Sequence, residues 1–324
     1  MTAPGGLVYY PDDRPGISRR RCGRGFSYIA PDGTTIDDRT ERQRLAALAV
    51  PPAYDQVWIS PREDGHLQAT GRDTRARKQY RYHPDWTAHR AQAKFDDLVT
   101  FGAALPRIRR RIARDLDGEA GDQDYAIAAV LALIDRLSLR VGHPDYAAEN
   151  GSYGATTLTG RHLRLRDGEV RLRYVAKGGV KVARTLRDRR LNQVLGQLHD
   201  LPGATLASWI DDGGNTRAVT SNDINARLSE LVESPGITAK TFRTWNGSVA
   251  AMEAAVQADS ITIKAMAQAA SERLANTPTI ARNSYIHPRV IALAEDPAGL
   301  DVPVPDIAGL RKAERQLMGL LGGG

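Results

Sequence analysis

The spacing of hydrophobic residues changes near residue 90, and this change predicts two domains. Before it, short apolar stretches such as 26–29 and 56–59 are separated by turn-forming proline, glycine and aspartate, as in β-hairpins. After it, apolar residues recur every three or four positions, as in helices. The pattern predicts an α+β protein, with a small β-rich N-terminal domain over 1–90 and a larger, mainly α-helical domain over 91–324.

Several amphipathic stretches define the helices that we expect. They span 40–49, 91–101, 105–116, 191–198, 221–232, 248–256, 263–274 and 310–324. Thr40 and Ser221 are expected to cap two of them. Five arginines between 107 and 114 are expected to form a solvated or phosphate-facing side, not a specific site. The last helix ends in a run of glycines and is expected to be frayed.

The strongest helical pattern covers 124–140. Its stripe of apolar residues comprises Ile127, Val130, Leu131, Ile134 and Leu137. Arg140 lies three residues beyond Leu137, so it is expected on or near the buried side at the end of this helix. A guanidinium there is costly unless an anion meets it. A structural salt bridge and a bound phosphate both satisfy that need.

A hairpin with one basic face is predicted over 161–175. Leucines and a tyrosine alternate with arginines on both sides of the turn at 167–168. A third strand is expected over 180–186. Lys177 then lies in the glycine-rich turn between the last two strands, where it is free to enter a groove.

Tyr285 is the candidate nucleophile. Asn276 and Pro278 end the preceding helix, so Tyr285 is expected on a second short helix or turn that Pro288 closes. Arg282 lies one turn before it. The phenol is either a nucleophile toward a phosphodiester or a buried structural tyrosine.

The segment 71–83 combines basic and aromatic residues. Its candidate nucleic-acid contacts are Arg72, Arg77, Lys78, Gln79, Tyr80 and Tyr82. In an extended strand, Tyr80 and Tyr82 share one face and are flanked by donors that reach phosphates or base edges. A solvated basic strand is the alternative interpretation.

Composition restricts the class of function. The chain has 324 residues, a formal charge of +7 and a pI near 9.6, which favours a polyanionic partner such as nucleic acid. The longest apolar run is too short to span a bilayer and the N-terminus is not a secretory signal, so a cytoplasmic protein without a membrane partner is expected. The single Cys22 rules out an internal disulfide, and no motif suggests a metal site. Ser234 and Ala239 replace the glycines of a phosphate-binding loop, so no nucleotide cofactor is expected.

The remaining candidates suit phosphoryl transfer without a metal. They are Arg140, Lys177, Lys240, Arg243, Asn276 and Tyr285, and Lys240 and Arg243 are expected to face the same way on a helical turn. All except the tyrosine are donors. Such a set neutralises the negative charge that spreads over the phosphate oxygens in the transition state.

Taken in order, short motifs over 50–290 resemble the poxvirus-type (type IB) DNA topoisomerases, specifically a bacterial member. The matching segments are 50–54, 65–73, 77–84, 139–142, 149–154, 240–245, 276–278 and 285–288. The resemblance implies that Tyr285 attacks the scissile phosphate to form a 3′-phosphotyrosyl bond and that Lys177 protonates the departing 5′-oxygen. It also implies that Arg140 and Arg243 bind the nonbridging oxygens. Asn276 stands where some relatives have histidine, which leaves it only a donor role.

The resemblance also predicts a nucleoid-associated monomer that relaxes supercoiled duplex DNA without ATP, cofactor or metal, with two lobes forming a DNA clamp. Two alternatives remain, a tyrosine site-specific recombinase and a DNA-binding protein without catalytic activity. Recombinases usually carry histidine three residues before the second arginine, where this chain has Lys240. The roles of Asn246 and His287 are left open, with a structural role favoured for His287.

Overall fold

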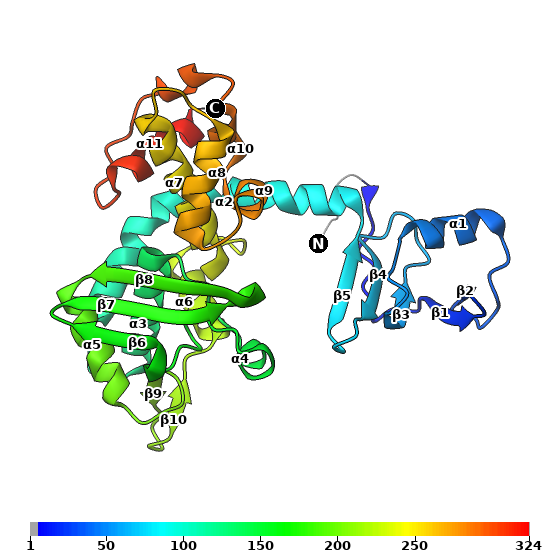
Figure 1. Ribbon diagram of the computed structural model, residues 1–324, viewed down its shortest axis with the longest axis horizontal. Coiled ribbons are helices and arrows are strands. Elements are labelled where there is room, and N and C mark those ends of the chain that lie inside the picture. The colour runs from blue at the N-terminus through cyan, green and yellow to red at the C-terminus, as the bar shows by residue number, and fades with distance from the viewer. Residues whose placement is uncertain (1–5, 324) are drawn as a thin grey trace. The chain divides into compact units, whose positions relative to one another are not determined.

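The computed structural model describes residues 6–323, without the side chains of 91–94, and confirms an α+β fold (Figure 1). Its backbone divides into two compact units, Met1–Ala93 and Lys94–Gly324. The first contains a five-stranded antiparallel sheet, and the second is mainly helical with two small sheets. Within the described residues, no helix has the length and apolar character needed to cross a bilayer.

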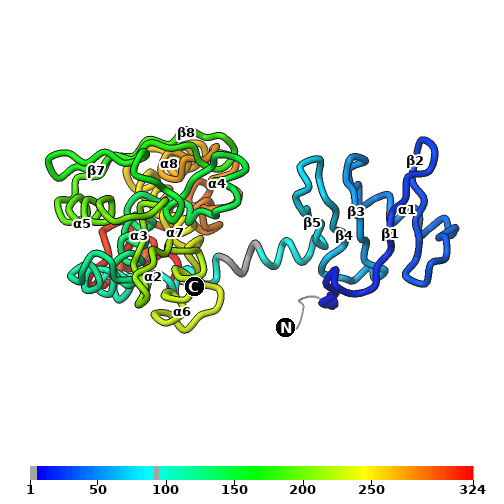
Figure 2. Tube along the Cα trace, turned by 90° about the horizontal axis from the view of Figure 1, so that it is seen from below, coloured from blue at the N-terminus to red at the C-terminus, as the bar shows by residue number. Residues whose placement is uncertain are grey.

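The first unit is built on one sheet with strand order β2-β1-β3-β4-β5, which Figure 2 shows side by side. The strands are β1 Ile17–Cys22, β2 Gly25–Ile29, β3 Asp55–Ile59, β4 Leu67–Arg72 and β5 Lys78–Tyr82. A small core of buried apolar residues lies on one side of the sheet and includes Ile17, Ile59 and Leu45 of helix α1. The predicted strands at 26–29 and 56–59 are thereby confirmed.

Helix α1 spans Arg39–Ala47, and its cap differs from the prediction. Asp38, not Thr40, is the N-cap, and its carboxylate accepts a 2.7 Å hydrogen bond from the amide of Glu41. A carboxylate at this position both satisfies a free amide and interacts favourably with the helix dipole.

Helix α2 spans Pro84–Asp115 as one helix, where two separate helices were predicted. Phe101, Leu105 and Ile108 are fully buried at a spacing of three to four residues, so one apolar stripe runs through the expected break. Pro106 lies inside this helix. Packing of this stripe therefore keeps the chain helical through the expected break.

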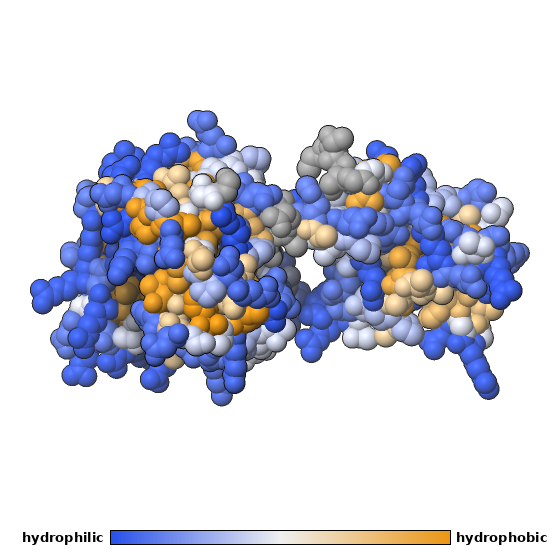
Figure 3. Space-filling view, turned by 90° about the horizontal axis from the view of Figure 1, so that it is seen from above, coloured by the Kyte–Doolittle hydropathy of each residue, from blue (hydrophilic) through white to orange (hydrophobic). Residues whose placement is uncertain are grey.

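The core of the second unit is formed by helices α3 and α7, whose residues are mostly buried. Its helices are α3 Gln123–Leu137, α4 Pro144–Asn150, α5 Arg189–Asp200, α6 Ser221–Leu231, α7 Ala239–Gln257, α8 Ile263–Leu274, α9 Pro278–Tyr285, α10 Pro288–Ala292 and α11 Lys312–Gly322. On the face shown in Figure 3, apolar patches lie among predominantly hydrophilic side chains.

A three-stranded sheet confirms the predicted hairpin and its third strand. Its strands are β6 Leu163–Arg166, β7 Glu169–Ala176 and β8 Val180–Arg187, and a second sheet pairs β9 Ser208–Ile210 with β10 Thr216–Ala218. Leu163 lies opposite Leu172 and Arg164 opposite Arg171, so one face is apolar and the other basic, as expected. Asp167 and Gly168 both have positive φ, as a tight hairpin turn requires.

Two helix starts in the second unit were predicted wrongly. Thr220 caps α6 in place of Ser221, because its hydroxyl accepts from the amide of Asp223 while that carboxylate accepts from the Thr220 amide. Helix α7 begins at Ala239, not Ser248, after a similar reciprocal cap between Thr238 and Thr241. The earlier start makes Arg243 a helical residue.

The predicted frayed tail is incorrect, and the predicted solvated arginine face is confirmed only in part. Arg107, Arg110 and Arg114 are exposed, whereas Arg109 is partly buried and paired. Leu317 and Glu314 of α11 are fully buried, and Arg109 forms bidentate pairs with Glu314 and Asp135 at 2.7–3.0 Å. The sequence did not reveal these pairs, because both carboxylates come from other helices. The buried network ties α11 to the middle of the unit.

Candidate active site

Tyr285 is the last residue of α9, which follows the end of α8 directly, as predicted. Helix α8 ends after Leu274 with Ala275 in the left-handed region at φ 49°. Thr277 then caps α9 by accepting a 3.3 Å hydrogen bond from the amide of Ile280. This turn places Asn276 between the two helices, and Tyr285 is half-buried.

The backbone at Tyr285 is fixed against α7. A Cβ on Gly247 would lie 2.8 Å from the Tyr285 carbonyl oxygen, so only glycine permits this approach. The Ser248 hydroxyl donates to that carbonyl at 3.2 Å and accepts from the amide of His287 at 2.9 Å. Helix α7 therefore holds the candidate nucleophile through backbone contacts.

Arg243 points from α7 toward Tyr285 and is only 3% exposed. Its guanidinium donates to the carbonyl of Ser138 and, at 2.9 Å, to that of Leu274. Its Cζ lies 5.1 Å from the centre of the Tyr285 ring. Burial, and then the nearby charge of Arg140, lower the pKa of Arg243 to about 10.

Arg140 donates a short hydrogen bond to the side-chain oxygen of Asn276. The amide nitrogen of Asn276 is buried and has no hydrogen-bond partner among the described residues. Unmade hydrogen bonds of buried donors are costly, so this nitrogen is suited to an incoming acceptor. Arg140, Arg243, Asn276 and Tyr285 thus come together, although far apart in sequence.

The segment that carries Arg140 is held by a second segment around Gly154. The amide of Ala155 donates to the Arg140 carbonyl and that of Thr156 to the Val141 carbonyl, both at 2.8 Å. A Cβ on Gly154 would lie 2.6 Å from the Arg140 carbonyl oxygen. The motifs at 139–142 and 149–154 are therefore packed against each other.

Asn246 is a supporting residue whose role the sequence left open. Its buried amide nitrogen donates at 3.0 Å to the Asp135 carbonyl and at 3.0 Å to the Ser138 hydroxyl. Ser138 ends α3 in the left-handed region and provides the carbonyl that Arg243 binds. Asn246 thus stabilises the turn that leads from α3 to Arg140.

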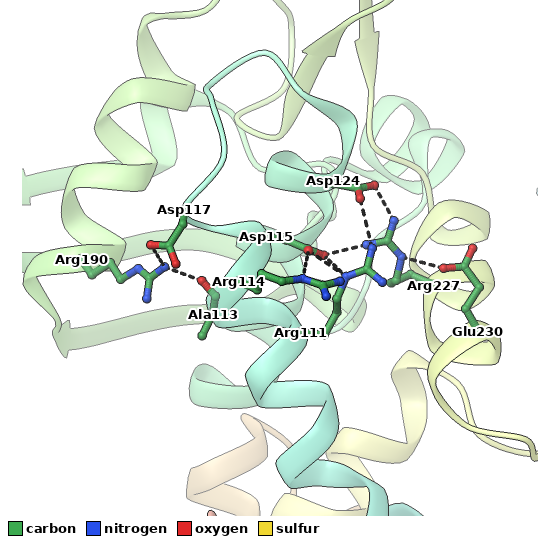
Figure 4. A network of polar contacts seen from close by, with 9 residues as sticks. All are labelled: Arg111, Ala113, Arg114, Asp115, Asp117, Asp124, Arg190, Arg227 and Glu230. Carbon is green, nitrogen blue, oxygen red and sulfur yellow. Dashed lines mark hydrogen bonds and ion pairs between the residues drawn. The ribbon is translucent and has the colours of Figure 1, made fainter.

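Arg140 and Arg243 differ from the buried Arg227 in their partners. Arg227 contacts Asp115, Asp124 and Glu230, in the network drawn in Figure 4. Among the described residues, the hydrogen bonds of Arg140 and Arg243 go only to neutral oxygens. The positive charge beside Tyr285 is therefore not neutralised by carboxylates.

The two candidate lysines are exposed. Lys177 lies in the turn Lys177–Gly179, where Gly178 and Gly179 have positive φ, as the sequence predicted. Lys240 is exposed on the first turn of α7 while Arg243 is buried, so the expectation that they face the same way is incorrect. Their different burial follows from the packing of α7 against its neighbours.

Strand β5 presents the predicted aromatic face in the first unit. Tyr80 and Tyr82 are 50% and 45% exposed, and their rings stack with centroids 6.0 Å apart. They border a cavity of about 380 Å³ that is also lined by Gln79 and Arg81. Stacked, exposed rings of this kind can pack against the surface of a binding partner.

The polar residues around this face are already engaged. Asp73 accepts from Arg77 and, at 3.0 Å, from Gln79, and the Arg77 interaction lowers the pKa of Asp73 to about 2. Lys78 pairs with Asp12 at 2.5 Å. Arg72 donates to the side chain of Gln56 and to the Ala76 carbonyl.

His287 has a structural role in this arrangement. Its Nδ1 accepts from the amide of Arg289 at 3.0 Å, which caps α10. Burial, and then the nearby charge of Arg289, lower the pKa of His287 to about 4. The ring is therefore neutral at pH 7. Among the described residues, no group of three or more histidine, cysteine or acidic side chains is arranged to hold a metal ion.

Two families of DNA topoisomerases match parts of this chain. Residues 25–73 match the family described as bacterial DNA topoisomerase IB, N-terminal domain, and residues 83–282 match eukaryotic DNA topoisomerase I, catalytic core. DNA topoisomerase 1B of Acanthamoeba polyphaga mimivirus is 29% identical over 72% of this chain and 70% of its own length. DNA topoisomerase 1B of Vaccinia virus (strain Copenhagen) is 22% identical over 82% of this chain and 86% of its own length.

Among solved structures, XerH site-specific recombinase in a post-cleavage complex matches 59% of this chain and 50% of its own, at 13% identity and a TM-score of 0.40. That score is too low to establish a shared fold.

Proposed function

Since the chain belongs to the type IB DNA topoisomerase family, we propose that it relaxes supercoiled duplex DNA by cutting and resealing one strand without ATP or metal. Tyr285 loses its phenolic proton to solvent and attacks the scissile phosphorus, so a bond from its oxygen to phosphorus forms while the bond to the 5′-oxygen breaks. The product is a 3′-phosphotyrosyl enzyme. One phosphodiester replaces another, so no external energy source is needed.

The observation that carries this proposal is the unneutralised positive charge beside Tyr285. Arg140 and Arg243 are oriented by neutral oxygens, so their charge remains available to the nonbridging oxygens of a phosphate. The free amide nitrogen of Asn276 supplies a further donor. Preorganised donors of this kind stabilise a transition state without having to reorganise.

Lys177 is proposed as the general acid. It transfers a proton to the departing 5′-oxygen, which otherwise leaves as a strongly basic alkoxide. Its position on an exposed turn leaves it accessible to DNA. Reversal of the same step, with the 5′-hydroxyl as nucleophile and Tyr285 as leaving group, reseals the strand.

The two compact units, Met1–Ala93 and Lys94–Gly324, support a two-domain assignment, with DNA binding over 1–90 and catalysis over 91–324. Tyr80 and Tyr82, together with Gln79, Arg72, Arg77 and Lys78, are proposed to contact duplex DNA, as is Lys240 on α7. The exposure of the two stacked rings supports this role. We propose that the enzyme acts as a monomer.

Plasmid relaxation tests the proposal. Positively and negatively supercoiled circles are incubated with the protein in EDTA without ATP, and topoisomers are resolved by gel electrophoresis. Both circles should relax. A folded protein that leaves both unchanged refutes the function. A Tyr285→Phe variant controls for contaminating activity.

A further inference from the structure

Arg184 of β8 binds the same helix end as Arg243. Its Nη2 donates to the carbonyls of Glu272 at 2.8 Å and Arg273 at 3.0 Å. Arg243 donates to the next carbonyl, that of Leu274. Guanidinium groups from a strand and from a helix therefore bind three consecutive carbonyls at the end of α8.

This helix end leads directly into the candidate active site. The last carbonyls of a helix lack partners within it and carry partial negative charge, so cations bind there favourably. Asn276 follows two residues after Leu274, and its oxygen accepts from Arg140. Arg184 thus supports the turn that positions the unpartnered donor of Asn276.

Arg184 also provides a specific link between two parts of the second unit. Among the described residues, its hydrogen bonds are the only ones that join strands β6–β8 to helices α7–α10. No carboxylate in the described part of the chain forms an ion pair with it, and burial lowers its pKa. The phenol of Tyr174, 8% exposed on the neighbouring strand, is one of the groups that interact with it.

The link has a mechanical consequence for Lys177. Strands β7 and β8 pair without interruption from Ala176↔Val180 to Glu169↔Arg187, so the hairpin is continuous from Arg184 to its tip. Val180, beside the turn, lies four positions before Arg184 on β8, a span of roughly 13 Å. Fixing the strand at Arg184 therefore restricts where the tip points.

We propose that Arg184 is a positioning residue that aligns the Lys177 hairpin with the arginine cluster through the end of α8. This inference rests on the proposed function, because it concerns the general acid of that reaction. Arg184 touches no reacting atom. It acts by placing the proton donor where the 5′-oxygen departs.

Replacing the leaving atom isolates this effect. A cleavage position is first mapped on a linear duplex with the parent protein, and duplexes with oxygen or sulfur at the bridging 5′ position are then prepared. A thiolate leaves without a proton, so sulfur removes the need for a general acid. Single-turnover rates of covalent adduct formation are measured for Arg184→Ala, with Lys177→Ala and Arg243→Ala as references.

Arg184→Ala should cleave the oxygen substrate at least about tenfold more slowly than the parent, a loss of about 1.4 kcal/mol of transition-state stabilisation. On the sulfur substrate it should approach the parent rate, as Lys177→Ala should, whereas Arg243→Ala stays slow. Arg187→Ala is the matched control, since it lies on the same strand with its side chain 90% exposed. It should resemble the parent on both substrates.

An equal defect of Arg184→Ala on both substrates, or no defect on oxygen, overturns the inference. Arg184→Gln retains one amide donor and covers the case in which the alanine variant does not fold. It should show a smaller defect with the same recovery on sulfur, and a defect without recovery again overturns the inference. If the parent forms no adduct with either substrate, the proposed function fails instead.

Discussion

The guanidinium carbon of Arg243 lies 5.1 Å from the centre of the Tyr285 ring, so a buried positive charge is held beside the candidate nucleophile. Backbone carbonyls of Ser138 and Leu274 orient this group from two helix ends. The charge is therefore placed before any substrate arrives. That preorganisation is the physical basis of the predictions that follow.

Removing Arg140 should slow cleavage strongly. Arg140→Ala loses a donor to a nonbridging oxygen, and we expect a loss of roughly 3 to 4 kcal/mol of transition-state stabilisation, or about two to three orders of magnitude in rate. Adduct formation under single-turnover conditions with saturating protein measures this. The exposed Arg282, one turn before Tyr285, supplies the control variant Arg282→Ala. An Arg140→Ala rate within tenfold of the parent contradicts the assignment.

Asn276 should act through its amide nitrogen. Asn276→Asp retains an oxygen for Arg140 but replaces the free donor with an anionic oxygen that repels phosphate. It should therefore cleave more slowly than Asn276→Ala, which only loses the donor and should cost about tenfold to a hundredfold. Rates of adduct formation for the two variants decide this. If the aspartate variant equals the parent, the nitrogen has no role.

Glu314 should stabilise the fold because it pairs with buried Arg109. Glu314→Gln weakens a charge-assisted network without changing side-chain size, and we expect a loss of about 2 to 3 kcal/mol in the free energy of unfolding. Urea denaturation measures it. Asp306→Asn serves as control, since Asp306 pairs with Arg315 while 93% exposed and should change stability by less than about 1 kcal/mol. If both substitutions lower the free energy of unfolding by equally small amounts, helix α11 contributes little to the stability of the fold.

Stability should fall in mild acid through His287. The folded pKa is about 4, below the ordinary value of 6.5, so the unfolded chain binds a proton first. This contribution is complete above pH 6.5 and is lost as the pH falls toward about 4. Allowing for the partial exposure of the ring, we expect a loss of about 1 to 2 kcal/mol.

His287→Asn retains an acceptor that can cap α10 and has no titratable group. Urea denaturation of the parent and this variant at pH 7 and pH 4.5 should show a smaller acid loss for the variant. Identical pH dependence would assign the loss to other groups.

Much of the fold followed from local patterns in the sequence. The hairpin at 161–175 was predictable because apolar and basic residues alternate there, and the end of α8 because Asn276 and Pro278 interrupt the helix. The break in α2 was predicted wrongly, because the buried stripe from Phe101 to Ile108 keeps the helix continuous through it. Arg109 was misassigned because its carboxylate partners lie 26 and 205 residues away.

The candidate site was predicted only in part for a similar reason. Arg140, Arg243, Asn276 and Tyr285 were identified as candidates, and the structure brings them together, but their catalytic roles stay predictions. Asn246 and Arg184 donate hydrogen bonds to backbone carbonyls of distant helices. Every residue has such a carbonyl, so the sequence does not show which of them a side chain binds. Only the tertiary packing shows which oxygen each side chain reaches.

Mapping the DNA–protein bond tests the central claim most directly. The reaction is stopped with detergent during cleavage, the DNA is digested, and the modified peptide is identified by mass spectrometry. The account predicts that the DNA is attached through a 3′-phosphate to Tyr285, and that Tyr285→Phe binds duplex DNA but yields no adduct. Attachment to another residue, attachment through a 5′-phosphate, or an adduct in the phenylalanine variant would contradict it.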